Sequence, residues 1–116
     1  MAERKTSKVE KERELMKAID RFVNDFTLGT DTPEEGKKMF DLLSQAEKEP
    51  DCPKEAYTAL AICYEKGYGC EASQEKAKEY ALKGKDGKRG YCQRYLGELY
   101  KNGWFGLEEE WVEKAI

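Results

Sequence analysis

Residues 56–67 read AYTALAICYEKG, and residues 92–103 read CQRYLGELYKNG. Both stretches place a small residue, then Leu, then Ala or Gly, then Tyr, then Gly at the same offsets, and the shift from Ala56 to Cys92 is 36 residues. The Leu and Tyr, four positions apart, share one face of a helix, and the Gly suits a helix end. The repetition predicts helix pairs of about 36 residues that bury their apolar faces by stacking on neighbouring pairs.

Apolar residues at steps of three and four predict helices along the rest of the chain as well. The expected helical segments are about 15–28, 32–49, 54–66, 73–83, 91–101 and 108–116. Thr32 and Ser73 are suitable capping residues, and Pro33 suits a first turn. Aromatic residues at core spacing are expected to be buried: Phe22, Phe26, Phe40, Tyr64, Tyr80, Tyr95 and Tyr100.

The segments combine into an all-α fold, a right-handed α-solenoid of stacked antiparallel helix pairs. We expect a flexible charged segment over 1–13 and a single helical-repeat domain over 14–116. The repeats span about 14–51, 52–87 and 88–116, which makes about 2.5–3 pairs, with a degenerate first pair and a truncated last one.

Composition narrows the classes of function. The chain has 116 residues and a formal net charge of -3, which argues against direct nucleic-acid binding. It has no apolar run long enough to span a membrane. The charged first residues do not resemble a secretory leader, although a removed leader would leave no trace, and a cytoplasmic location is expected. There is no histidine, the commonest general base and metal ligand. We therefore predict no catalytic residue, no metal and no cofactor.

The four cysteines do not form a metal-binding pattern. Cys52, Cys63, Cys70 and Cys92 include no C-x-x-C pair, so zinc binding is not expected. Cys70 and Cys92 are interpreted as small buried residues. Reduced thiols are the expected state for a cytosolic chain.

Residues 60–70, LAICYEKGYGC, followed by EKA at 75–77, resemble the Sel-1-like repeat family, a branch of the tetratricopeptide-like helical repeats. The family pattern is Leu-Gly-x-x-Tyr-x-x-Gly-x-Gly-Val, then an acidic residue, any residue, Lys and Ala. Residues 96–103 and 113–115 are similar to it again, and the similarity is good over 52–116 and weaker over 14–51. A cysteine-rich branch ties each repeat with a disulfide, but the corresponding helix end, 81–84, has no Cys.

The resemblance implies an adaptor whose first helices line a concave, partner-binding face. Transferred position by position, the candidate residues are Glu55, Thr58, Ile62 and Glu65 in the second repeat and Tyr91, Arg94, Glu98 and Lys101 in the third. The degenerate first repeat would add Lys17, Asp20, Asn24 and Thr27. Trp104 is a further candidate, because it is an aromatic residue in a loop insertion. The alternative for each of them is an ordinary solvated helix position or a packing role.

The predicted function is therefore a protein-interaction module that binds a peptide or protein surface through its concave face. One alternative is a small inhibitor or accessory protein that occupies a partner's surface. Another is an enzyme, because cysteine-rich members of the family are associated with beta-lactam hydrolysis, but no nucleophile motif supports it. Self-association through Trp111, Val112 and Ile116 at the truncated end is a further expectation.

Overall fold

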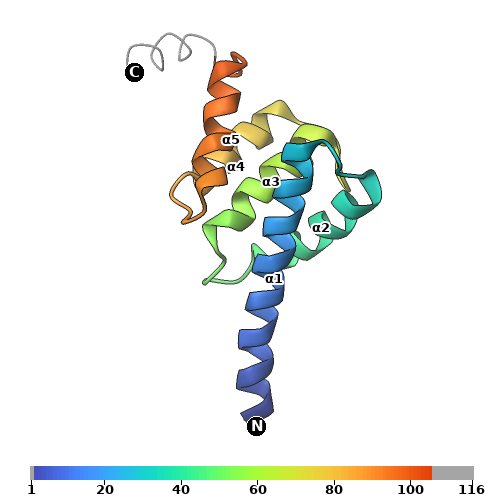
Figure 1. Cartoon of the computed structure of the whole chain (residues 1–116), viewed down its shortest axis with the longest axis vertical. Helices are drawn as coiled ribbons and strands as arrows, with labels where there is room; N and C mark the ends of the chain where they lie inside the picture. Colours follow the sequence, from blue (N-terminus) through green and yellow to red (C-terminus); the bar gives the residue numbers. More distant parts are fainter. Residues whose placement is uncertain (1, 106–116) are drawn as a thin grey trace.

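A computed structural model of the chain describes residues 2–105, with side chains from residue 9 onward (Figure 1). This part of the chain contains helices and no strands, which confirms the all-α class. The helices are α1 (Ala2–Leu28), α2 (Pro33–Ala46), α3 (Lys54–Lys66), α4 (Gln74–Gly84) and α5 (Gly90–Lys101). The sixth expected helix, 108–116, and its residues Trp111, Val112 and Ile116 lie outside the described residues.

The first helix is longer than the sequence predicts. It begins at Ala2, and Figure 1 shows its first half extending beyond the body formed by the other helices. Val9 is 47% exposed, whereas Ile19 and Phe22 are fully buried. The apolar stripe that starts at Leu15 therefore marks the point where α1 joins the core. The backbone of residues 2–13, expected to be a flexible segment, is helical in the structure.

The helix ends follow the signals in the sequence. The Oγ1 of Thr32 accepts a hydrogen bond from the backbone N–H of Glu35 at 3.2 Å, and the Oγ of Ser73 caps α4 in the same way at 3.2 Å. Gly67 ends α3 with φ of 74°, in the left-handed region that glycine adopts without strain. These contacts satisfy backbone groups that a helix leaves unpaired at its ends.

The core is organised around α3. This helix packs against each of the other four and most extensively against α4 (Figure 1). Every residue of α3 from Ala59 to Cys63 is buried, because neighbours cover the helix on all sides. Its apolar partners come from every other helix: Ile19, Phe22, Val23, Met39, Leu43, Tyr80, Ala81, Tyr95 and Leu99.

Only three of the seven aromatic residues that the sequence predicts to be buried are buried in the structure. Phe22, Tyr80 and Tyr95 are buried. The remaining four are only partly covered, and three of them pack against the core: Phe26, Phe40 and Tyr64. Tyr100 stacks on Phe105 with 4.3 Å between ring centroids.

No disulfide joins the four cysteines, all of which are free. Cys92 is buried, as expected, whereas Cys70, which was also expected to be buried, is only half-buried. Cys63 is buried and Cys52 is half-buried. Burial raises the pKa of the Cys63 thiol, so the thiol stays protonated and unreactive at neutral pH. Among residues 2–105, no helix is both long enough and apolar enough to cross a membrane.

Candidate functional site

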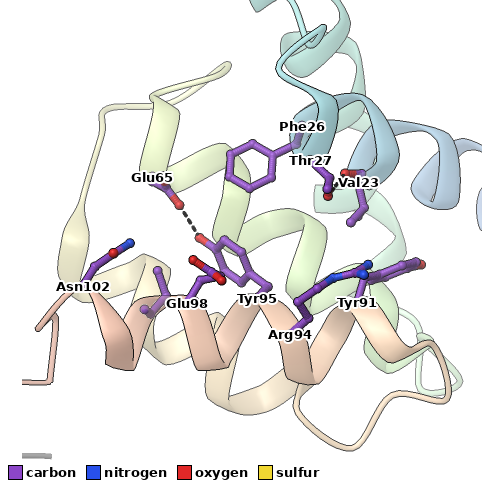
Figure 2. Close-up of a pocket in the computed structure, with 10 residues that line it drawn as sticks. Val23, Phe26, Thr27, Glu65, Tyr91, Arg94, Tyr95, Glu98 and Asn102 are labelled. Carbon is purple, nitrogen blue, oxygen red and sulfur yellow. Dashed lines mark hydrogen bonds between the residues drawn. The ribbon is translucent and has the colours of Figure 1, made fainter. Parts of the chain in front are cut away.

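A pocket of about 350 Å³ lies between the C-terminal half of α1, the end of α3 and the length of α5 (Figure 2). Its lining combines apolar and charged side chains. The residues are Val23, Phe26, Thr27, Glu65, Tyr91, Arg94, Tyr95, Glu98, Leu99 and Asn102. A concave site with apolar walls and a few polar groups is the usual form of a ligand-binding site.

Tyr95 forms the floor of this pocket. Its side chain is 6% exposed, and its hydroxyl donates a hydrogen bond to the Oε1 of Glu65 at 2.7 Å (Figure 2). The ring of Phe26 meets it edge to face, with 5.8 Å between ring centroids. Burial raises the pKa of the Tyr95 hydroxyl, and the Glu65 carboxylate adds to the effect. The phenol therefore stays protonated and holds the Glu65 side chain in place.

The rim of the pocket follows one face of α5. Tyr91, Arg94, Glu98 and Asn102 occupy successive turns, since positions three or four apart lie above one another on a helix (Figure 2). Arg94, Glu98 and Asn102 are exposed. Within residues 9–105 their side chains make no hydrogen bond or ion pair. These groups are therefore available to a ligand.

One end of the pocket is held by a carboxylate of α1. The hydroxyl of Tyr91 donates to the Oδ1 of Asp20 at 2.5 Å, and the Nε of Arg89 donates to the same oxygen at 3.2 Å. Burial raises the pKa of the Tyr91 hydroxyl, and its hydrogen bond to Asp20 adds to the effect. The contact joins the start of α5 to the C-terminal half of α1 beside this end of the pocket.

The structure brings part of the sequence-predicted set together. Four of the nine candidates outside the degenerate first repeat line the pocket: Glu65, Tyr91, Arg94 and Glu98. Thr27, the equivalent position of the first repeat, lines it as well. Lys101 is exposed outside the pocket, and Trp104 is half-buried against the core, so neither is part of this site.

Three candidates need correction because they are buried. Glu55 is 6% exposed, and Thr58 and Ile62 are fully buried. The cause is the central place of α3, which the other four helices surround: Thr58 packs closely against Gly84 of α4, and Glu55 lies under the loop between α4 and α5. The Oε2 of Glu55 accepts hydrogen bonds from the backbone N–H of Lys88 at 2.6 Å and of Arg89 at 3.1 Å. Glu55 thus anchors the loop between α4 and α5 and does not face a partner.

The sequence-based set also misses five lining residues. Val23, Phe26, Tyr95, Leu99 and Asn102 line the pocket although none was a candidate. The first four belong to the apolar stripes of α1 and α5, which by themselves predict burial. The edges of those stripes are accessible only because a gap remains between α1 and α5. These helices are far apart in the sequence, so no local sequence pattern predicts the gap.

The described part of the chain has no group of three or more Cys, Asp or Glu side chains placed to hold a metal ion. Comparison with protein-family models, with curated proteins and with solved structures finds no match for the chain. The site has therefore to be interpreted from its own geometry.

Proposed function

We propose that this chain is a protein-interaction module that binds a peptide segment of a partner protein in the pocket between α1, α3 and α5. In this proposal the chain is a right-handed α-solenoid of the Sel-1-like type, with α1, α3 and α5 as the first helices of successive pairs. A cytoplasmic location and the absence of nucleic-acid binding remain predictions from the sequence.

The pocket itself supports the proposal. It lies where the first helices of the three proposed pairs converge, which is the concave side of a solenoid and the surface such arrays present to partners. Its floor is aromatic and apolar, through Tyr95, Phe26 and Leu99. Its rim carries Arg94 and Glu98 without partners among residues 9–105. A desolvated aromatic centre with a polar rim is the anatomy of a protein-binding site.

The same geometry favours binding over catalysis. Tyr95 is a protonated hydrogen-bond donor, and Glu65 is engaged with it. Neither arrangement pairs a nucleophile with a general base. An inhibitor that covers a partner's surface would use the same pocket, so the experiment below tests the binding that both roles require.

A displayed library of random linear peptides tests the proposal. The library is panned on three proteins in parallel: the full wild-type chain, a pocket variant and a control variant. The pocket variant carries Arg94→Glu and Glu98→Lys. The control variant carries Glu79→Lys on α4 and Lys85→Glu just after it. All four side chains are exposed, so the fold should survive each change. We expect the library to yield peptides that bind the wild type and the control variant but do not bind the pocket variant. Peptides that bind all three proteins equally, or no enriched peptide, would overturn the proposal.

A further inference from the structure

The acidic and the basic side chains of the pocket lie at opposite ends of it. Figure 2 shows the Glu98 side chain on the same side of the pocket as Tyr95, whose hydroxyl points to Glu65, while Arg94 extends toward Tyr91. Arg94 and Glu98 are one helical turn apart, yet they form no ion pair with each other. Glu65 has the neutral Tyr95 hydroxyl as its partner within the described residues. Among residues 9–105, no ion pair therefore neutralises Glu65, Glu98 or Arg94.

The wall between the charges suits a long side chain. Phe26, Tyr95 and Leu99 form its apolar part. Lys and Arg bury an aliphatic stem along such a surface while the charged head stays with a polar partner. The ring of Phe26 already accepts a cation, because the Nζ of Lys66 lies 5.5 Å from its centroid. Since Lys66 already contacts the Phe26 ring, the stem of a ligand's cationic side chain would lie along Tyr95 and Leu99, with its head toward the acidic end of the pocket.

The spacing of the two ends fits an extended peptide. Arg94 and Glu98 are four residues apart on α5, and four residues of an α-helix rise about 6 Å. Two residues of an extended chain advance about 6.6 Å, and their side chains point to the same side. A ligand with a basic and an acidic residue separated by one position would therefore meet Glu98 and Arg94 together.

We infer that the pocket selects a peptide segment in which Lys or Arg lies two positions from Asp or Glu. The basic side chain binds between Glu65 and Glu98, and the acidic side chain binds Arg94. The inference rests on the proposed function, because it specifies the peptide that the same pocket would bind.

Amide chemical shifts of the isotopically labelled full chain provide the test. The probes are four blocked seven-residue peptides that differ only in their centre: Lys-Leu-Glu, Lys-Leu-Lys, Glu-Leu-Glu and Gln-Leu-Gln. We expect Lys-Leu-Glu to shift the amides of Glu65, Arg94, Tyr95 and Glu98 saturably, about tenfold more tightly than Gln-Leu-Gln. Glu98→Gln and Arg94→Gln should each weaken it about two- to fivefold, and Glu79→Gln on α4 should leave it unchanged.

The outcomes separate this inference from the proposed function. If Glu-Leu-Glu, Lys-Leu-Lys or Gln-Leu-Gln binds the pocket as tightly as Lys-Leu-Glu, or if no peptide shifts these amides, the charge pair is not what the pocket selects. The inference also fails if Glu98→Gln has no more effect than Glu79→Gln. In each case library peptides that need the pocket but lack the charge pair would still support peptide binding.

Discussion

The hydroxyl of Tyr91, at the start of α5, donates a 2.5 Å hydrogen bond to Asp20 in the C-terminal half of α1. The two residues are 71 positions apart in the sequence. The bond connects the first and the last helix of the described chain across α3. It lies beside one end of the pocket.

Removal of this bond should weaken the fold. Tyr91→Phe keeps the ring and deletes the hydroxyl, so we expect the free energy of unfolding to fall by about 1 kcal/mol, the typical loss for one hydrogen bond. Urea unfolding followed by circular dichroism measures the difference. Lys17→Gln is the control, because its side chain is 76% exposed and its pair with Glu14 should contribute almost nothing. Equal stabilities of the two variants would show that the bond does not support the fold.

The contact between α2 and the loop that follows α3 should not tolerate a methyl group. A Cβ on Gly36 would lie 2.2 Å from the ring of Tyr68, which is buried and hydrogen-bonded to Asp31. Since the ring cannot move without losing these contacts, Gly36→Ala should destabilise the protein by about 1–3 kcal/mol.

Gly90→Ala is the matched control for that substitution. Gly90 starts α5, and no heavy atom lies within 4 Å of its added Cβ. Its effect on the unfolding midpoint should be neutral or slightly stabilising, because Ala has the higher helix propensity. If Gly36→Ala and Gly90→Ala have the same free energy of unfolding, the packing at Gly36 is not as close as the structure indicates.

The free energy of unfolding should fall in alkaline solution, because tyrosine hydroxyls that are shielded from solvent ionise less readily in the fold than in the unfolded chain. Burial, together with the hydrogen bond to Asp31, raises the pKa of Tyr68 to about 12 in the fold, above its ordinary value near 10. Below pH 10 this contribution is complete, and it is lost as the pH rises from 10 to 12 because only the unfolded chain ionises there. Denaturant unfolding between pH 8 and 11.5 should show the decline. Tyr68→Phe should make the decline shallower, while the raised pKa values of Tyr80, Tyr91 and Tyr95 maintain part of it. An unchanged slope in that variant would contradict the assignment.

Glu35 should destabilise the fold slightly at neutral pH. Partial burial raises its pKa, and its contact with Asp25 adds to the effect. A raised carboxyl pKa means that ionisation is less favourable in the fold. The cost therefore accumulates between the ordinary and the raised pKa, is complete above the raised pKa and disappears in acid. Glu35→Gln should therefore gain a few tenths of a kcal/mol at pH 7 and nothing at pH 3, after allowance for solvent screening. A variant less stable than the wild type at pH 7 would show that the charge is favourable.

The helices of this fold could be predicted from the sequence because their signals are local. The caps at Thr32 and Ser73 and the stop at Gly67 each depend on a few neighbouring residues. The start of α1 could not be predicted in the same way, because residues 2–13 lack the apolar stripe on which the prediction relies. Their charged composition is compatible with an exposed helix as well as with an irregular segment.

The site could be predicted only in part, for a reason that Glu55 and Tyr91 show together. They occupy equivalent positions of successive repeats, yet Glu55 is buried under the next loop and Tyr91 faces the pocket. Repeat register predicts which side of a helix a residue lies on. Whether that side is covered depends on the neighbouring helices, so two positions that match in the sequence can differ in burial.

The central claim is that a peptide binds between α1, α3 and α5, and titration calorimetry tests it directly. A peptide selected on the wild-type chain is titrated into the wild type, the Arg94→Glu and Glu98→Lys pocket variant, and the Lys85→Glu and Glu79→Lys control. We predict that the pocket variant binds at least about tenfold more weakly, a loss of about 1.4 kcal/mol, while the control keeps the wild-type affinity. The claim is contradicted if the folded pocket variant binds the peptide as tightly as the wild type does.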